Sequence, residues 1–483
     1  MLHNRAVATK RNATRHHALA RELEAMIESG TFRPGERLPS SRALALSKGA
    51  SPATVMEAYE LLADRGVVET RPRSGYYVRA RVPDAKSRPA RRAQPAVETV
   101  AVSDLVFGVL EQIRDRQVVP LGSAFPSPAF FPLPRLAQDL ARSARRMDPW
   151  RTVEDLSPGS RELRQQIAKR YAVHGMAVDP AEIVITSGAL EALNLCLGAV
   201  TRPGDIVAVE SPAFYGALQA VERAGLRAIE IASDPVTGVD LGALQGALER
   251  HPVKACWFMP NLQNPLGATM PEEKRAELVR LLARHDVPLV EDDAYAELRF
   301  GAALRPAKAF DAKGLVLHCG TFSKSLAPGY RVGWCVPGRF RQAVERAKLM
   351  TSIATSVPAQ EGIAEYLRQG GYDRHLRQLR RHFADNQARL VGQVEAHFPR
   401  GTRVTRPEGG YFVWVEMPRA SDAMTLHRRA VQEGISIAPG AIFTASQRFA
   451  NALRLNHGHP WDERMARAVA RLGELARDLP ARD

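Results

Sequence analysis

Seven short apolar runs, mostly separated by stretches of helical character, dominate the chain between residues 183 and 336. They cover residues 183–186, 206–210, 228–231, 255–259, 289–291, 315–318 and 332–336. This alternation predicts an α/β fold, in which helices cover a mostly parallel sheet. Ligands bind such sheets at the carboxyl ends of the strands. Thr186, Glu210, Met259, Asp292 and Thr321 lie at or near those ends, so we expect them to converge.

Lys324 follows the sixth run, within Gly320-Thr-Phe-Ser-Lys-Ser-Leu-Ala-Pro-Gly-Tyr-Arg331. A lysine at the end of a buried strand is costly unless it has chemistry to perform. A Schiff base with pyridoxal 5'-phosphate (PLP) is such chemistry, because the amine can hold the aldehyde. Thr321, Ser323 and Arg331 can then hold the phosphate. The alternative is a surface lysine in a polar loop.

Two upstream segments favour the PLP site. Val287-Pro-Leu-Val-Glu-Asp-Asp-Ala-Tyr295 is a short strand that ends in acids. Asp292 is predicted to bind the pyridine nitrogen, and Tyr295 the ring hydroxyl, although an Asp-Asp pair alone is more typical of a helix N-cap. The Asn-Pro-x-Gly turn in Pro260–Gly267 presents Asn264 at another strand end. Together, in this order, the three segments predict PLP chemistry.

From about Pro120 to its C-terminus the chain resembles the fold-type I aminotransferases, by these motifs and by Ile185–Ala192, Glu210–Tyr215 and Leu453–Asn456. The resemblance implies that Lys324 and Asp292 are catalytic and that no metal is required. It also implies that Phe214 stacks on the ring, that Asn264 contacts the ring hydroxyl, that Arg454 and Asn264 bind the substrate, and that the backbone of Gly188, Ala189 and Leu190 binds the phosphate.

Positions 189, 190 and 216 differ from those of relatives, and the neighbours of Arg454 predict the strand that carries it. Ala189 and Leu190 lack the polar side chains that relatives often carry there. Gly216 stands where relatives that sense γ-aminobutyrate have an arginine, which argues against that ligand. Leu453 and Leu455 alternate with Arg454, so we expect a half-buried strand.

Residues 14–79 predict a winged helix-turn-helix. An apolar stripe at 18–29, a serine-capped helix at 38–47, and a helix opened by Ser51-Pro precede two strands within 67–78. A small helical interaction domain is the alternative. The segment resembles the GntR winged helix, and the whole chain resembles MocR-type transcriptional regulators. The resemblance places the DNA contacts at Arg42, Ser51, Thr54, Arg71, Ser74 and Gly75, whereas Pro52 and Met56 replace arginines that are frequent in relatives.

Residues 80–100 contain prolines and many charges, which predicts an extended basic linker. The aminotransferase-like domain then spans 101–483 and includes a small C-terminal α/β domain, indicated by the apolar runs at 410–415 and 435–437. The net charge of +15 favours a polyanionic partner. Four cysteines without a CxxC spacing indicate a reduced, cytoplasmic protein. No apolar run is long enough to span a membrane.

These features favour a PLP-dependent regulator that binds a double-stranded DNA operator as a homodimer and senses an amino compound, or PLP itself. A working aminotransferase that acts on an amino acid and a 2-oxo acid is the alternative. A dimerisation module with an inactive site is less compatible with the combination of Lys324, Asp292 and Asn264.

Overall fold

The computed structural model describes residues 16–27, 31–32, 35–64, 66–71, 75–78, 96–111, 117–154, 157–446 and 448–480. The chain divides between residues 86 and 87 into two compact units, which are considered one at a time. Ser74 and most of the predicted linker lie outside the described residues.

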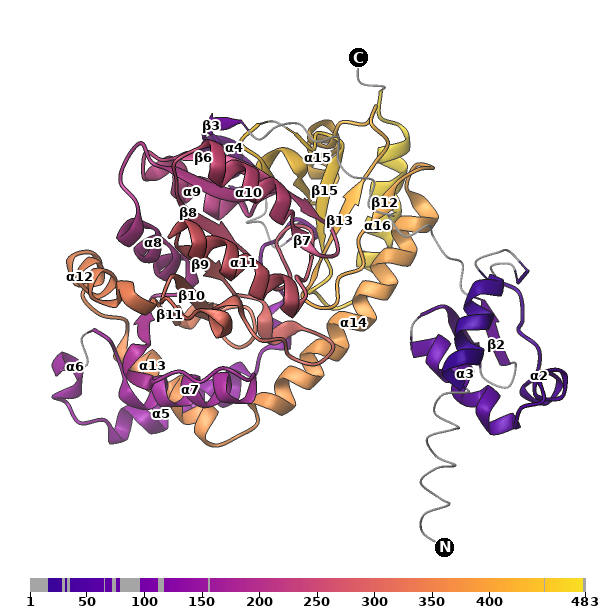
Figure 1. The fold of residues 1–483 in the computed structure, drawn as a ribbon, viewed down its shortest axis with the longest axis horizontal. Helices are drawn as coiled ribbons and strands as arrows, with labels where there is room; N and C mark the ends of the chain where they lie inside the picture. The colour runs from indigo at the N-terminus through magenta and orange to yellow at the C-terminus, as the bar shows by residue number, and fades with distance from the viewer. Residues whose placement is uncertain are drawn as a thin grey trace, which may run out of the picture. The chain divides into compact units, whose positions relative to one another are not determined.

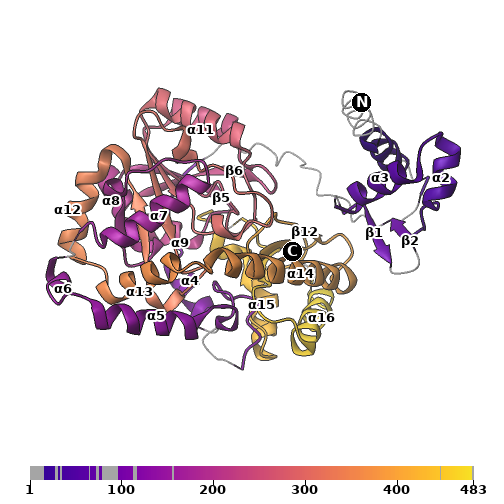
Figure 2. The same ribbon diagram turned by 90° about the horizontal axis from the view of Figure 1, so that it is seen from below.

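The N-terminal unit contains a helix at residues 16–27, α2 (Ser41–Lys48), α3 (Pro52–Asp64) and the antiparallel strands β1 (Val68–Arg71) and β2 (Gly75–Val78) (Figures 1 and 2). The side chain of Ser40 caps α2 by accepting from the Ala43 N–H, and that of Ser51 caps α3 by accepting from the Thr54 N–H at 3.1 Å. Arg37 forms a bridge with Tyr77 and so extends the hairpin. The predicted winged helix-turn-helix is confirmed.

The large sheet of the C-terminal unit runs in the order β3-β6-β5-β8-β9-β10-β11-β4, with β7 paired to β6. Its central strands β6, β5, β8, β9 and β10 are parallel, and β3, β11 and β7 pair antiparallel to their neighbours. The strands are β3 (Val97–Thr99), β4 (Val184–Thr186), β5 (Ile206–Ser211), β6 (Arg227–Asp234), β7 (Gly238–Val239), β8 (Val253–Phe258), β9 (Leu289–Asp292), β10 (Val316–Thr321) and β11 (Gly333–Val336).

Helices cover both faces of this sheet, which explains why its strands are continuous apolar runs. Val207 and Val209 pack toward the α8 and α9 side, whereas Ile206 and Ala208 pack toward the α10 and α11 side. The helices are α4 (Ser103–Glu111), α5 (Leu133–Arg146), α6 (Arg151–Glu154), α7 (Arg161–Val173), α8 (Ala189–Val200), α9 (Tyr215–Arg223), α10 (Leu241–Arg250), α11 (Glu272–His285), α12 (Arg341–Thr351) and α13 (Val357–Arg368).

A second, antiparallel sheet in the order β12-β13-β15-β14 forms the small C-terminal domain. The long helix α14 (Tyr372–His397) leads to it from the side of α5, α7 and α13 (Figure 1). Leu379 and Phe383 of α14 pack with Tyr295 and Tyr411, which joins the two parts. The remaining elements are β12 (Arg403–Val404), β13 (Phe412–Glu416), α15 (Ala423–Gln432), β14 (Ala438–Pro439), β15 (Ala452–Asn456) and α16 (Glu463–Arg477).

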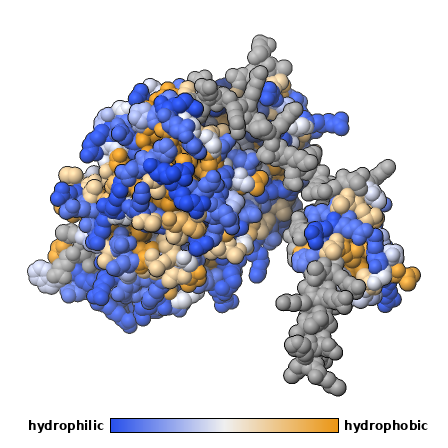
Figure 3. Space-filling model, in the orientation of Figure 1, coloured by the Kyte–Doolittle hydropathy of each residue, from blue (hydrophilic) through white to orange (hydrophobic). Residues whose placement is uncertain are grey.

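The structure corrects the end of the predicted linker. Val97–Thr99 is not extended solvated chain but strand β3, which pairs with Ala228 and its neighbours on β6. The visible surface is mostly hydrophilic with interspersed apolar residues (Figure 3). Within the described residues, no helix is long and apolar enough to cross a membrane.

Candidate functional site

The neighbouring carboxylates Asp292 and Asp293 at the end of β9 lie on opposite faces of the sheet, because successive side chains of a strand point to opposite faces. Asp293 accepts from Asn261 Nδ2 at 2.8 Å and lies 3.7 Å from His318 Nε2. Asp292 is only 1% exposed, and its Oδ1 accepts from the Ala294 N–H at 3.3 Å. Burial, reinforced by the charge of Asp293, raises the pKa of Asp292 to about 7, while Lys324 opposes this rise. Asp292, and not Asp293, is therefore the carboxylate whose charge acts on Lys324.

Lys324 is half-buried at the carboxyl end of β10. Its Nζ donates to the Ala124 carbonyl at 3.2 Å and lies 4.0 Å from the ring centre of Phe125 and 5.7 Å from that of Tyr295. Burial lowers the pKa of Lys324 to about 7, and the positive charges of Arg454 and Arg331 add to this effect. A lysine with this pKa is about half neutral at pH 7, and its neutral form is a competent nucleophile.

Arg454 lies on β15 and is fully buried. The alternation of Arg454 with leucines predicts a half-buried strand, but every residue of β15 is buried. Its Nη1 donates to Asn264 Oδ1 at 3.0 Å, and its Nη2 donates to the carbonyls of Gly122 at 3.0 Å and Ser123 at 3.2 Å. The guanidinium lies 4.0 Å from the ring centre of Phe412. The structure therefore brings Arg454 and Asn264, which are 190 residues apart, into direct contact.

The β4–α8 turn and the segment after β10 meet where the sequence predicts phosphate binding. Gly188 precedes α8 with φ of 94°, and a Cβ at that position would lie 2.6 Å from Nη2 of Arg331. Arg331 also has a positive φ, of 52°, which is uncommon for a residue other than glycine and is often found at functional sites. Thr321 Oγ1 donates to Ser323 Oγ at 3.0 Å, and Ala189 and Leu190 form the first turn of α8. All the predicted phosphate ligands thus lie around the N-terminus of one helix.

Phe214 precedes α9, and Gly216 is required for its ring position. A Cβ on Gly216 would lie 2.6 Å from the Phe214 ring. An arginine at position 216 is incompatible with this placement of Phe214. Glu210, which is expected only as a strand-end residue, and Gln263, which is not predicted, tie this loop to the Asn264 turn. Gln263 Nε2 donates to the Pro212 carbonyl at 2.8 Å, and Glu210 accepts from the Met259 N–H at 3.1 Å.

The sequence prediction also missed residues 122–125, whose four carbonyl oxygens are all held by polar side chains of the C-terminal unit. Arg454 binds the first two carbonyls, and Lys324 and Tyr411 bind that of Ala124, each at 3.2 Å. Asn456 Nδ2 donates to the Ser123 carbonyl at 2.9 Å and to the Phe125 carbonyl at 2.8 Å. Main-chain oxygens have no residue-specific signature, so no sequence signal identifies this segment.

In the N-terminal unit, the residues predicted to contact DNA differ in how exposed they are. Arg42 is exposed on α2, and Ser51 is exposed at the start of α3. Thr54 is only 5% exposed, and its hydroxyl lies 2.8 Å from Ser51 Oγ, so it completes the cap instead of facing solvent. Gly75 opens β2 with φ of 105°, and a Cβ there would lie 3.3 Å from Nε of Arg37. The side chain of Arg71 lies outside the described set.

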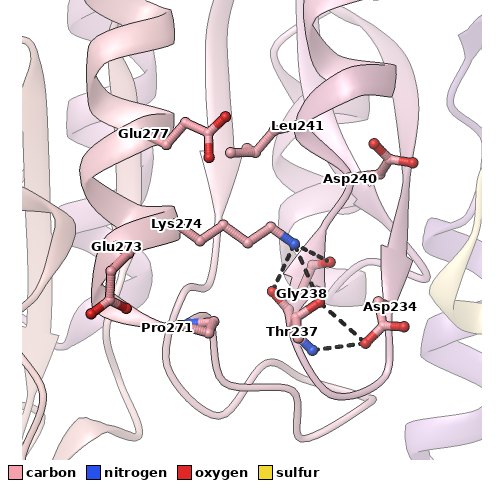
Figure 4. A pocket seen from close by; sticks show the side chains of 9 residues that line it. All are labelled: Asp234, Thr237, Gly238, Asp240, Leu241, Pro271, Glu273, Lys274 and Glu277. Carbon is pink, nitrogen blue, oxygen red and sulfur yellow. Dashed lines mark hydrogen bonds between the residues drawn. The ribbon is translucent and has the colours of Figure 1, made fainter.

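A separate cavity of about 530 Å³ lies between the β6–β7 turn and α11 (Figure 4). Lys274 extends across it and donates to the Thr237 carbonyl at 3.0 Å. The cavity is rimmed by Asp234, Asp240, Glu273 and Glu277, and none of the predicted site residues lines it. Within the described ranges, no group of acids, histidines and cysteines is arranged to hold a metal ion.

Comparisons with known proteins match both units. Residues 118–472 match the family "Aminotransferase class I and II", and residues 16–78 match "Bacterial regulatory proteins, gntR family". The uncharacterized HTH-type transcriptional regulator YdcR of Escherichia coli is 44% identical over 96% of this chain and 99% of its own length. The probable rhizopine catabolism regulatory protein MocR of Rhizobium meliloti is 29% identical over 88% and 86%. A kynurenine aminotransferase of Pyrococcus horikoshii, solved in complex with PMP, is 31% identical with a TM-score of 0.71 over 77% and 94%.

Proposed function

Because this chain belongs to the class I and II aminotransferase family and carries a gntR-family domain, as MocR-type regulators do, we propose that it is a PLP-dependent, DNA-binding transcriptional regulator. One observation carries this proposal. The same chain contains a winged helix-turn-helix and a buried site in which Lys324 and Asp292 are both poised to titrate near pH 7. A relative named a transcriptional regulator matches across both units.

The cofactor is PLP, and the residues of the site fit it. Within the described part of the chain, Nδ2 of Asn264 and Nε of Arg454 are buried and have no hydrogen-bond partner. Such groups are costly unless a ligand or water satisfies them. Asp292 is a buried carboxylate with one long N–H contact, so it can accept a further donor. The donors and the acceptor thus match a ligand with an anionic end, a ring oxygen and a basic nitrogen.

Each side chain would have a distinct role toward this group. Lys324 supplies a neutral amine for the aldehyde carbon, and Asp292 keeps a proton on the pyridine nitrogen. When bound, PLP supplies an electron sink for reactions at the amino carbon of a ligand. The other contacts would be Asn264 and Tyr295 to the ring oxygen, Phe214 to the ring face, and Gly188, Ala189, Leu190, Thr321, Ser323 and Arg331 to the phosphate.

The ligand sensed by this site is an amino compound, or PLP itself. Arg454 can form a bidentate pair with a carboxylate, and such a pair would replace its contacts to the Gly122 and Ser123 carbonyls. Burial strengthens that pair, because little water competes with it. An α-amino acid is the simplest compound that offers a carboxylate to Arg454 and an amine near Lys324.

We place the protein in the cytoplasm as a homodimer. Its four cysteines are unpaired, which fits a reducing compartment. Trp150 and Val153 at α6, together with Met350 and Ile353 at the end of α12, are more than half exposed in the single chain. Large exposed apolar side chains of this kind are typical of protein–protein interfaces. Two copies would present two winged helices to paired half-sites.

An active aminotransferase is the second candidate, because the neutral amine of Lys324 and the guanidinium of Arg454 are both in place for an amino-acid substrate. One experiment separates the two functions. The purified full-length protein is tested for a mobility shift on its own promoter, with and without PLP and each amino acid, and for steady turnover of the same amino acids with a 2-oxo acid.

A ligand-dependent shift without turnover supports the regulator, and Lys324→Ala should remove the ligand dependence. Asp293→Asn is the matched control, because its carboxylate bonds Asn261 on the other face of β9. Turnover without any promoter shift would support the enzyme and contradict the regulator.

A further inference from the structure

Helix α3 presents an apolar face where a DNA-reading helix is expected to be polar. It is the second helix of the helix-turn-helix, and this helix enters the major groove with its N-terminal residues against base edges. Thr54, Val55, Ala58, Tyr59 and Leu62 are buried in the domain core. The opposite face exposes Pro52, Ala53, Met56, Glu57 and Glu60.

Three of the exposed side chains form a continuous apolar row. Pro52 and Met56 are four residues apart, and therefore neighbours on one side of a helix, and Ala53 lies beside them. Met56 is 44% exposed. The sequence of α3, PATVMEAYELLAD, contains no lysine or arginine. The helix therefore cannot bind guanine through a cationic fork, the commonest specific contact to DNA bases.

The acidic residues of this face do not change that conclusion. Glu57 lies 3.2 Å from Nδ1 of His16 and is thereby directed toward the helix at residues 16–27. Glu60 is exposed and repels phosphates, and at a base edge its carboxylate could accept only from the amino group of cytosine or adenine.

The cations that attract the phosphates lie on other elements. Arg42 is exposed on α2, and Arg37 is exposed beside the wing, with its Nε next to Gly75. These two arginines can position the domain on the backbone without carrying sequence information. Among the described residues, base selection is then left to α3, whose exposed side chains at positions 52, 53 and 56 are apolar.

In the major groove the only apolar group on a base edge is the C5-methyl of thymine. Resting on the DNA-binding function above, we propose that Pro52, Ala53 and Met56 read thymine methyl groups, so that each operator half-site has thymines beneath the first turns of α3. Exposure of Met56 alone would not justify this, since single exposed apolar residues are common. The proposal is justified by the row of three apolar residues together with the absence of any lysine or arginine on the helix.

The test replaces thymine by uracil, which removes only the methyl group. Full-length protein first selects its binding site from a random-sequence duplex pool, and each thymine of that site is then replaced singly. We expect uracil to weaken binding about fourfold at two or more thymines per half-site, the factor for one buried methyl-sized group.

Met56→Ala should abolish this uracil penalty at one of those thymines, whereas Met56→Leu should keep it. Leu46→Ala is the matched control, because Leu46 is an 87% exposed apolar residue of the same domain that lies on α2. It should leave every uracil penalty unchanged. Arg42→Ala should weaken binding to all duplexes by a similar factor.

Two results overturn the proposal while DNA binding stands: uracil without effect at every thymine, or a penalty at every position that is identical in wild type and Met56→Ala. If the full-length protein enriches no duplex from the pool, the proposed function fails as well. The two failures are therefore distinguishable.

Discussion

The two charged side chains beside Lys324 should move the titration of its amine in opposite directions. Burial is the main cause of its low pKa, the positive charge of Arg454 lowers it further, and the negative charge of Asp292 raises it. Arg454→Met should therefore raise the pKa of Lys324 toward its ordinary value of 10.5, and Asp292→Asn should lower it below that of the wild type. Asp293→Asn should leave it unchanged, because that carboxylate bonds Asn261 on the other face of β9.

The expected effect on reactivity is large. At pH 7.5, roughly three-quarters of an amine with a pKa of about 7 is neutral, against about 0.1% for an amine with a pKa of 10.5. Only the neutral amine attacks an aldehyde. The rate at which PLP attaches to the cofactor-free protein should therefore rise about tenfold per pH unit below pH 7 and level off above it.

The assay follows PLP attachment by visible absorbance in the cofactor-free wild type and the three variants. It covers about pH 5.5 to 9.5, the range on both sides of the expected midpoint. A lysine peptide measured in parallel corrects for the ionisation of PLP itself, and thermal melting verifies that each variant is folded. A wild-type midpoint near the ordinary lysine value, or shifts of the same sign in Arg454→Met and Asp292→Asn, would refute the electrostatic argument.

Three further results are expected. Lys324→Ala should remain folded and lose the borohydride-fixed cofactor mass in intact mass spectrometry; a retained adduct would assign the attachment to another lysine. Asp292→Asn should keep PLP but slow any amino-transfer half-reaction at least about 100-fold, as followed by stopped-flow absorbance; a rate equal to that of the wild type would move the role elsewhere. Removal of residues 1–79 should abolish operator binding, and Arg42→Ala should make the salt dependence of binding shallower by about one unit of slope. Specific binding by the truncated chain would contradict the winged-helix assignment. An unchanged slope in Arg42→Ala would contradict the phosphate contact of Arg42.

The central strands could be predicted from the sequence because helices cover both of their faces, which makes them continuous apolar runs. Strand β3 could not, since Val97-Glu-Thr99 is short, partly polar and paired only at the sheet edge with β6. The strand order could not be predicted either. Strand β4 pairs with β11, about 150 residues later, because Gly333 lets the backbone of Gly188 approach closely. That contact depends on tertiary packing rather than on a local pattern.

At the proposed site, the residues that the sequence identifies are those whose side chains would carry the chemistry, such as Lys324, Asn264 and Arg454. The residues that the sequence did not reveal act through the backbone or through other residues. The carbonyl of Ala124 receives Lys324, and Gln263 connects the loop before Phe214 to the Asn264 turn. Such roles require coordinates, because any residue has a carbonyl and a glutamine has many uses.

The acidic run Glu291-Asp-Asp293 shows how the fold resolves an ambiguity that the sequence leaves open. Glu291 and Asp293 point to one face of β9. There Oε2 of Glu291 lies 2.8 Å from Nδ1 of His318. Burial alone would lower the pKa of His318, but these two carboxylates outweigh it and raise the pKa. The raised pKa favours the protonated imidazole, whose positive charge offsets that of the two carboxylates. Asp292, on the opposite face, is the one carboxylate of the run whose charge acts on Lys324, and strand alternation therefore supports the role proposed for it at a pyridine nitrogen.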